Sequence, residues 1–298
     1  MADFGREHGL MLRQDYFGDP SAWQALVDLL QDTFSIDVNL QASFGDPDPT
    51  SMPFGYFDSD GRCVANFTVF SMPMMINGRT VKAAGYQSGA VRPEWRGRGL
   101  YRDLMQRAFA WAIAEGFELD MLLTSKPVLY EGYGFKTVPQ HVFVATKPKP
   151  VTSSTVARTL SLQATDDLRL MKALLERRKP VSRQFAVARQ MEMFHLNACF
   201  DPAIQLTAIS DDAIVVWTID GNVFRLLDIA ATAIPSLQTI LSALDVEPAR
   251  IEICFPPDLL DCGDIELEPY ESSIPLMVRG KAANEITGPL MLSPMAEF

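Results

Sequence analysis

The sequence predicts a mixed α/β protein with a central, mostly antiparallel sheet, followed by a second half that repeats the same order of elements. Three observations support this prediction. Apolar runs of strand length alternate with amphipathic helices, a glycine-bearing turn joins a strand to a helix in the first half, and a polar stretch with prolines divides the chain near its midpoint. With 298 residues, 48% of them hydrophobic, the chain can bury a substantial core, and two domains are expected.

The first half is expected to contain a helix, a meander of strands and a strand, helix, strand unit. Asp19 and Pro20 are typical of a helix start, because aspartate caps a helix and proline fits its first turn. Strands are expected at residues 54–57, 64–70, 81–91, 119–124 and 141–146. The pair Asn77-Gly78 is a strong signal for a hairpin turn. An amphipathic helix should begin at Leu100 and end at Gly116.

The second half is expected to begin with two helices, at residues 165–179 and 182–197. Strands should follow near 204–209, 214–219 and 223–229, then a helix with Pro235 near its start and a strand at 250–255. No glycine opens the second strand-to-helix turn, so this half is predicted to bind no coenzyme. The polar stretch Lys147 to Pro150 places the boundary between domains at 1–148 and 149–298.

The segment from Ala90 to Leu100 predicts an anion site. It has an apolar strand end, the turn Arg96-Gly97-Arg98-Gly99 and the start of an amphipathic helix. The first N–H groups of a helix have no partner within the helix, and the helix dipole favours negative charge there. Glycine also lets the backbone approach a phosphate closely, so a nucleotide pyrophosphate would fit this turn.

These residues and a second motif resemble the GCN5-related N-acetyltransferases (GNAT), whose fingerprint is Val-x-Pro-x-x-Arg-Gly-x-Gly followed downstream by Tyr-x-x-x-Gly-Phe. The matching positions are Val91, Pro93, Arg96, Gly97, Gly99, Tyr130, Gly134 and Phe135. The run from Arg98 to Met105 and the strand end Leu122-Leu123-Thr124-Ser125 resemble the enhanced intracellular survival type of multi-acetylating aminoglycoside acetyltransferases. Many family members have Gly or Ala where this chain has Tyr101.

The resemblance implies an N-acetyltransferase that moves an acetyl group from acetyl-coenzyme A to a primary amine of a small, cationic molecule, by direct attack in a ternary complex. The coenzyme-binding residues it implies are Ala90, Val91, Arg96, Gly97, Arg98, Gly99, Leu100 and Tyr101. Tyr130 would be the general acid that protonates the departing thiolate. The terminal carboxylate of Phe298 would be the base, as in the branch whose chains end in Phe. Ser88 and Ser125 are candidates to line the amine pocket, and no metal ligands are expected.

The composition argues against several other classes of binding partner. The formal net charge of −11 argues against nucleic acid and against anionic membrane surfaces. The four cysteines are scattered without a Cys-x-x-Cys pattern, which indicates neither a zinc site nor a disulfide framework. No leader and no membrane-spanning run is found in the sequence, so a cytoplasmic protein is expected. A homo-oligomer is possible, because the related branch assembles into oligomers.

Two other functions remain open from the sequence. One is an acyl-coenzyme A-binding regulatory or inactive GNAT-like protein that has kept the glycine turn and lost turnover. The other is a protein N-acetyltransferase, which would need an open groove. The apolar C-terminal run is expected to dock on the protein, with Leu290, Met291, Leu292, Met295 and Phe298 buried.

Overall fold

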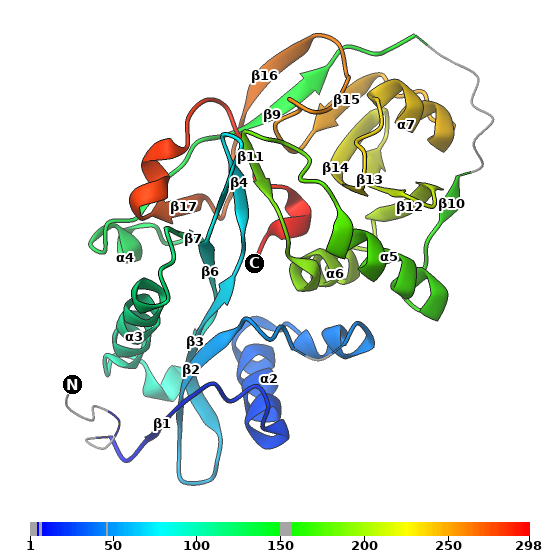
Figure 1. Cartoon of the computed structure of the whole chain (residues 1–298). Coiled ribbons are helices and arrows are strands. Elements are labelled where there is room, and N and C mark those ends of the chain that lie inside the picture. The colour runs from blue at the N-terminus through cyan, green and yellow to red at the C-terminus, as the bar shows by residue number, and fades with distance from the viewer. Residues whose placement is uncertain (1–4, 6–7, 46, 150–156) are drawn as a thin grey trace. The chain divides into compact units, whose positions relative to one another are not determined.

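The computed structural model describes residues 5, 8–45, 47–149 and 157–298 (Figure 1). The chain folds into two compact units. The first contains Met1–Ser71, Lys82–Leu122 and Phe298, and the second contains Met72–Val81 and Leu123–Glu297. The predicted linker ends at Pro150, which lies outside the described residues. The domain boundary after residue 148 stays a prediction.

The sheet of the first unit is mostly antiparallel. Its strands, in spatial order, are β1 (Met11–Gln14), β2 (Met52–Phe57), β3 (Cys63–Ser71), β6 (Ala83–Val91) and β7 (Leu119–Leu123). The first four pair antiparallel, whereas β6 and β7 run parallel. A parallel pair needs a crossover, and α3 (Leu100–Ala114) supplies it. This arrangement places the glycine turn at the end of β6.

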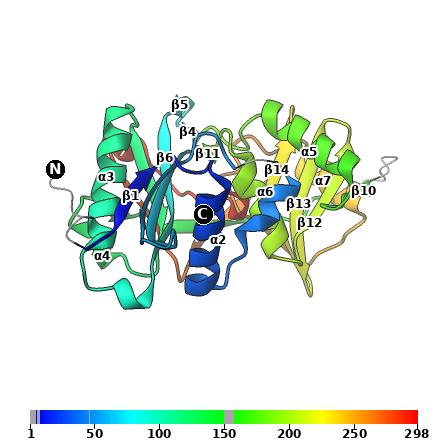
Figure 2. The same cartoon turned by 90° about the horizontal axis from the view of Figure 1, so that it is seen from below.

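Helices cover both faces of this sheet, which explains why β3 is buried along almost its whole length. The helix α2 (Pro20–Phe34) packs against β3 and β6, and α3 packs against β2, β3 and β6. The two helices lie on opposite sides of the sheet (Figure 2). The expected start of α2 is confirmed, because the Asp19 carboxylate accepts hydrogen bonds from the N–H groups of Ser21 and Ala22. A 3₁₀ helix, η1 (Val38–Ser43), follows α2.

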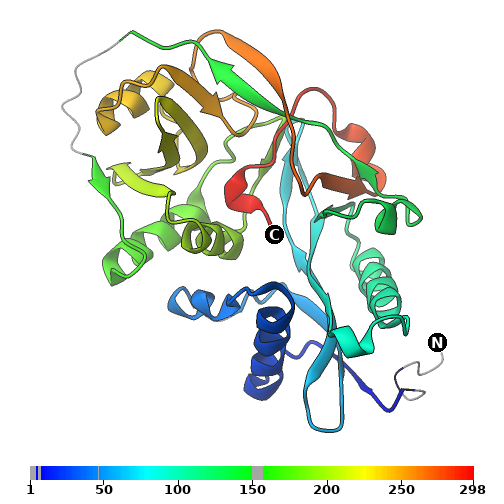
Figure 3. The ribbon, with the colours of Figure 1, turned by 180° about the vertical axis from the view of Figure 1, so that it is seen from behind.

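The second unit contains a seven-stranded sheet with a similar order of pairings. Its strands are β10 (Arg158–Thr159), β12 (Gln205–Ser210), β13 (Ala213–Asp220), β14 (Val223–Ala231), β15 (Arg250–Ile253), β9 (Gln140–Ala145) and β16 (Ile265–Tyr270). The strands β12, β13 and β14 are antiparallel, and β14 pairs parallel with β15 through α7 (Leu237–Leu244). The helix α5 (Thr165–Arg177) packs against β13 and β14, and α7 packs against β12 (Figure 3).

The remaining elements of the second unit are short. A three-stranded sheet combines β11 (Phe185–Val187), β4 (Met74–Ile76) and β5 (Arg79–Val81). The predicted hairpin is confirmed, because Asn77 and Gly78 join β4 to β5 with φ values of 47° and 80°. The strand β17 (Leu276–Arg279) pairs with β8 (Lys136–Thr137). The other elements are α4 (Val128–Glu131), α6 (Met191–Phe200), η3 (Lys281–Glu285) and η4 (Pro294–Ala296).

The expected mixed α/β fold is confirmed, but two predicted elements differ in the structure. Residues 182–197 do not form one helix, because they contain β11 and the first part of α6. The Ser182 hydroxyl accepts hydrogen bonds from the N–H groups of Gln184 and Phe185, which competes with a helical turn. The following residues then pair with β4, which is distant in sequence. The single strand expected at 81–91 is also divided between β5 and β6.

The C-terminal segment is docked as expected. Leu290, Met291, Leu292 and Met295 are each at most 2% exposed, whereas Phe298 is only half-buried. In the second unit η4 packs against α6 and β14. None of the helices in the described residues is both long and apolar enough to cross a membrane.

Candidate active site

The glycine turn lies between a short 3₁₀ helix, η2 (Pro93–Trp95), and α3. Gly97 and Gly99 have φ values of 75° and 80°, in the left-handed region that favours glycine. A Cβ atom added to Gly97 would meet nothing within 4 Å, so the turn faces open space. The pattern Arg-Gly-x-Gly is therefore explained by backbone conformation at both glycines.

The turn leaves backbone donors available. Gly99 is the N-cap of α3 and provides no side-chain cap. No backbone acceptor among the described residues bonds to the N–H groups of Gly97, Gly99 or Leu100. The two arginines are exposed beside them. Arg96 donates through Nε to the Val91 carbonyl oxygen at 3.1 Å, and the Arg98 guanidinium lies 4.5 Å from the Trp95 ring centroid. This combination suits a pyrophosphate.

The strand that leads to the turn contains a bulge. Asn66 of β3 pairs with Ala90, and Thr68 pairs with Gln87, so Ser88 and Gly89 of β6 together face one residue of β3. Ser88 has a φ of 55°, which costs about 1–2 kcal/mol for a residue with a side chain. The structure therefore holds Ser88 in an unfavourable conformation. We call Ser88 and Gly89 the β6 bulge.

The strands β6 and β7 separate before the bulge. Their parallel pairing covers Ala83 to Gly85 of β6 and stops there. At this fork the Tyr86 hydroxyl donates to the Asp120 carboxylate of β7 at 2.8 Å, and both side chains are buried. Beyond the fork the edge of β6 that faced β7 has no strand partner among the described residues.

Tyr101, the residue that departs from the family pattern, lies against the β6 bulge. A Cβ atom on Gly89 would be 2.5 Å from the Tyr101 hydroxyl oxygen, so a larger residue at position 89 would displace the ring. The ring also packs edge-on against Phe67 at 5.5 Å. No periodicity or spacing in the sequence indicates that Gly89 accommodates the Tyr101 ring.

Tyr130 and Ser125 belong to the second unit. Tyr130 lies in α4, is 7% exposed, and packs edge-on against Phe135 at 6.0 Å. Arg279 of β17 supports this motif, because its guanidinium lies 4.6 Å from the Phe135 ring centroid and donates to the Tyr133 carbonyl oxygen at 3.1 Å. Ser125 is exposed in the segment between β7 and α4. The sequence held no signal for the contribution of Arg279.

The first unit brings together the other predicted site residues. Ser88, Ala90, Val91 and residues 96–101 follow one another along β6, the glycine turn and α3. Ala90 is buried in a core cluster with Leu26 and Leu30 of α2. Phe298 packs edge-on against Phe70 of β3, with ring centroids 5.2 Å apart. The terminal residue is thus held at the sheet of this unit.

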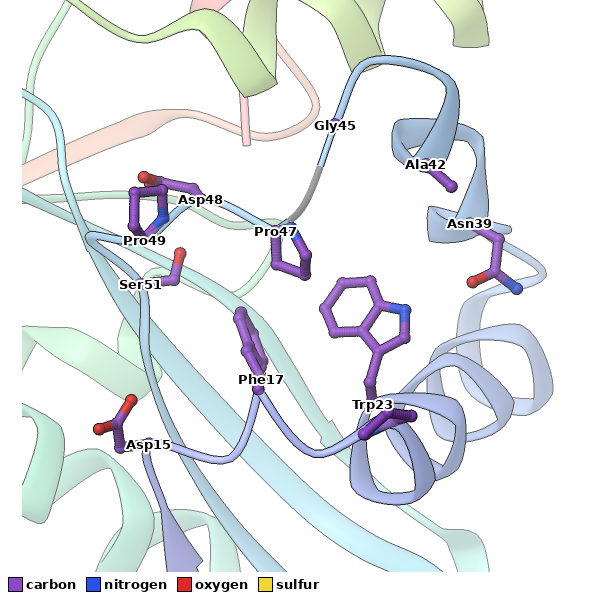
Figure 4. A pocket seen from close by; sticks show the side chains of 12 residues that line it. Asp15, Phe17, Trp23, Asn39, Ala42, Gly45, Pro47, Asp48, Pro49 and Ser51 are labelled. Atoms are coloured by element: carbon purple, nitrogen blue, oxygen red, sulfur yellow. The ribbon is translucent and has the colours of Figure 1, made fainter.

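The first unit also contains an open pocket of about 790 Å³ (Figure 4). Its lining combines aromatic rings, carboxylates and prolines without any basic residue: Asp15, Phe17, Gly18, Pro20, Trp23, Asn39, Ala42, Gly45, Pro47, Asp48, Pro49 and Ser51. The rings of Phe17 and Trp23 meet edge-on at 5.0 Å. Ser51 is 7% exposed, and its hydroxyl finds no partner among the described residues. Carboxylates and aromatic faces both attract organic cations.

Residues 19–138 match the family model described as an acetyltransferase (GNAT) domain. The chain contains a GNAT acetyltransferase domain. The matched region includes both halves of the fingerprint, from Val91 to Phe135. Members of this family transfer an acyl group from acyl-coenzyme A, so residues 19–138 form an acyltransferase domain of the GNAT type. No curated protein sequence matches the chain.

Solved structures show that the fold extends beyond the GNAT domain. A conserved protein of unknown function from Enterococcus faecalis has a TM-score of 0.60 at 14% identity, over 93% of this chain and 74% of that chain. Eis1 from Mycobacterium abscessus has a TM-score of 0.57 at 15% identity, over 91% and 73%. A GCN5-related N-acetyltransferase from Kribbella flavida has a TM-score of 0.55 at 17% identity, over 93% and 73%. At these identities the similarity concerns the fold alone.

Proposed function

We propose that this protein transfers an acetyl group from acetyl-coenzyme A to a primary amine of a small cationic molecule in a ternary complex. The observation that carries the proposal is the glycine turn, whose N–H groups at Gly97, Gly99 and Leu100 are available at the start of α3. The turn would bind the pyrophosphate, with Ala90, Val91, Arg98 and Tyr101 completing the coenzyme site. The coenzyme arm would then extend along β6 toward the bulge.

The reaction needs one bond to form and one to break. The neutral amine nitrogen attacks the thioester carbon, and the carbonyl oxygen gains negative charge that a β6 N–H would stabilise. The carbon–sulfur bond then breaks, and the sulfur takes a proton from the Tyr130 hydroxyl. The nitrogen of the tetrahedral intermediate loses its extra proton to a base, so the product is a neutral amide, and Tyr130 is later reprotonated from solvent.

Tyr130→Phe tests the general acid. We expect kcat to fall by about 100- to 10,000-fold, because general acid catalysis contributes in that range, while the thermal shift produced by acetyl-coenzyme A persists. Tyr133→Phe is the matched control, since it removes a hydroxyl three residues away and should retain activity. A Tyr130→Phe variant with normal kcat would remove the proposed acid.

The terminal carboxylate of Phe298 is the proposed base. The contact between Phe298 and Phe70 supports this role, because it anchors the end of the chain on β3 of the first unit. Phe298→Leu keeps a terminal carboxylate and should retain most activity. Deletion of Phe298 shifts the carboxylate by one residue and should lower kcat at neutral pH. Equal activity of the deletion and Phe298→Leu variants would exclude the carboxylate as the base.

The pocket of the first unit supports a cationic acceptor. Asp15 and Asp48 offer negative charge, and Phe17 and Trp23 offer aromatic faces. Ser88 and Ser125 are proposed to line the path of the reacting amine. We expect Asp15→Asn to raise KM for diamines more than for monoamines of equal chain length. Asp28→Asn on the exposed face of α2 makes the same change in net charge and should alter neither KM.

The first experiment is direct. Acetyl-coenzyme A at millimolar concentration should raise the melting temperature, because a ligand of the native state stabilises it. Thiol release should then be measured with polyamines, aminoglycosides, amino acids and peptide amines. No thermal shift would exclude the coenzyme site. A thermal shift without thiol release for any amine would favour a coenzyme-binding protein without turnover.

A further inference from the structure

A buried hydrogen-bond network holds the β6 bulge from the side of α2. Asn66 of β3 is completely buried, and its Nδ2 donates to the Ser88 carbonyl oxygen at 2.8 Å and to the Thr68 hydroxyl at 3.0 Å. Its Oδ1 accepts from the Tyr16 hydroxyl at 2.5 Å. Asn66 thus uses both amide hydrogens and its oxygen in these contacts.

The Tyr16 hydroxyl of this network remains a hydrogen-bond donor. Burial, the largest cause, raises the pKa of Tyr16 well above its ordinary value, so the hydroxyl stays protonated and continues to donate to Asn66. Tyr16 itself belongs to the core cluster between α2 and the sheet. Leaving any member unpaired in this core would cost the desolvation of a polar group. Asn66 is therefore fixed in one orientation.

The bond to Ser88 sets the direction of a neighbouring peptide group. A trans peptide is planar, and its C=O and N–H point in opposite directions. When the Ser88 carbonyl turns toward Asn66, the N–H of Gly89 in the same peptide unit points away from Asn66. Ser88 is held at a φ of 55°, a conformation that it would leave if the contact were lost.

Neither neighbouring strand can replace this contact. The pairing of β6 with β7 ends at Gly85, and the ladder between β3 and β6 is interrupted at the bulge. The Asn66 side chain bridges that interruption. A group that orients catalytic backbone through its carbonyl can matter as much as a group that touches substrate, because a misplacement of 1 Å can cost about 100-fold in rate.

We propose that Asn66 is a positioning residue for acetyl transfer: through the Ser88 carbonyl it fixes the β6 bulge so that the backbone presents its N–H groups to the thioester. This inference rests on the proposed function. It adds a residue on β3 to a site whose other proposed members lie on β6, the glycine turn, α4 and the C-terminus.

Asn66→Leu tests the proposal by removing both donors with little change in volume. We expect kcat to fall about 100-fold, while KM for acetyl-coenzyme A changes less than about threefold. The thermal shift produced by acetyl-coenzyme A should persist. Thr68→Val is the matched control, because it removes the other acceptor of the same amide and leaves the bond to Ser88. If both variants lose the same fraction of kcat, the bond to Ser88 has no special role.

A rescue distinguishes positioning from general loss of structure. Ser88→Gly in the Asn66→Leu background should restore kcat about tenfold, because glycine adopts a positive φ without strain. A structural role of Asn66 elsewhere would not respond to residue 88. Asn66→Leu leaves the Tyr16 hydroxyl unpaired, which by itself destabilises the core. The double variant Tyr16→Phe and Asn66→Leu removes both partners of that hydrogen bond and so avoids the unpaired hydroxyl.

Hydrogen exchange tests the same inference without any acceptor amine. Amides of residues 86–91 should exchange at least about tenfold faster in Asn66→Leu than in the wild type, and Thr68→Val should leave them protected. Unchanged protection in Asn66→Leu would overturn the positioning role. Absence of acetyl transfer by the wild type would instead contradict the proposed function, and the exchange measurement would still decide the role of Asn66.

Discussion

The two units contain two strand-to-helix turns of the same topology with opposite surroundings. In each unit three antiparallel strands lead into a parallel pair joined by a helix, β6-α3-β7 in the first and β14-α7-β15 in the second. Each of the strands β6 and β14 carries a bulge shortly before its turn. Backbone donors of the first turn are available, whereas two N–H groups at the start of the second helix are already paired.

Residues around the second turn accept hydrogen bonds from N–H groups at the start of α7. The Ser236 hydroxyl accepts from the N–H of Thr239 at 3.1 Å, and the N–H of Leu237 donates to the Asp261 carbonyl oxygen at 2.9 Å. The start of α7 therefore has few donors left for an anion. We propose on this ground that the second half is a degenerate GNAT-like copy that binds no coenzyme.

The polar groups around the second bulge are also paired. Parallel pairing of β14 with β15 continues to Leu226, next to the bulge, and the Leu227 carbonyl oxygen accepts from Ser293 of the C-terminal segment at 2.9 Å. Asp228 then forms a buried, two-pronged ion pair with Arg178. On this proposal, topology alone does not make a coenzyme site, and the deciding feature is whether the backbone groups at the turn and the bulge are already paired.

The largest expected effect is on the stability of the second bulge. Asp228→Leu leaves the Arg178 guanidinium buried without its partner, which should lower the free energy of unfolding by about 3–5 kcal/mol. Denaturant unfolding measures this change. The double variant Arg178→Met and Asp228→Leu should recover most of the loss, because an apolar pair needs no compensation for buried charge.

A surface pair provides the matched control for that prediction. Arg177 and Asp212 form an ion pair with side chains that are 53% and 63% exposed, so Asp212→Leu should change the stability by at most about 1 kcal/mol. The thermal shift with acetyl-coenzyme A should persist in all these variants. Its loss in a folded Asp228 variant would contradict the separation of roles between the two bulges.

The next effect concerns the open turn. Gly97→Val should lower the affinity for acetyl-coenzyme A by about 10- to 100-fold, because loss of one to two charge-assisted hydrogen bonds has that magnitude. Gly116 at the end of α3 has the same φ of 75° and the same absence of neighbours within 4 Å. Gly116→Val should therefore cause similar backbone strain and leave the affinity unchanged. Equal affinities of the two variants for the coenzyme would place its phosphates elsewhere.

A smaller effect is expected at the capped turn. Ser236→Ala removes the side-chain acceptor for the N–H of Thr239 and should lower the free energy of unfolding by about 1 kcal/mol. Ser236→Asp keeps an acceptor and should preserve stability. Neither change should alter coenzyme affinity. A gain of coenzyme binding in Ser236→Ala would show that the cap alone closes the second turn.

The sequence predicted what local chemistry determines. The cap at Asp19, the hairpin at Asn77-Gly78 and the glycine turn follow from residues that favour those conformations over a few positions. Docking of the apolar tail was predicted because five large hydrophobic side chains would otherwise be exposed, and four of them are buried in the structure. The family fingerprint then gave the fold class and the coenzyme.

The missed features depend on contacts between distant residues. Pairing with β4 determines β11, and no local pattern distinguishes this strand from the start of a helix. Asn66 lies in an apolar strand opposite Ala90, and only the bulge in the folded sheet brings the Ser88 carbonyl oxygen within reach of its amide. The acidic and aromatic residues of the pocket come from α2 and from the segments on both sides of it, so their spacing in sequence carries no signal.

The smallest effect sharpens the role of the C-terminal segment that fills the second bulge. Glu297 precedes the terminal residue, and Asn197 donates to its carbonyl oxygen at 2.8 Å. Burial raises the pKa of its side-chain carboxyl. The folded state therefore binds this proton more tightly than the unfolded state, so the carboxyl costs stability as pH rises above its ordinary pKa of about 4.3.

Glu297→Gln should consequently raise the melting temperature at neutral pH, with a gain that disappears below about pH 4 because both states of the wild type are then protonated. Calorimetry across this range measures the difference. Glu271→Gln removes the same charge from an exposed position and should leave the melting temperature little changed. A gain that is the same at all pH values would mean that packing of the amide, and not removal of a buried charge, stabilises the segment next to β14.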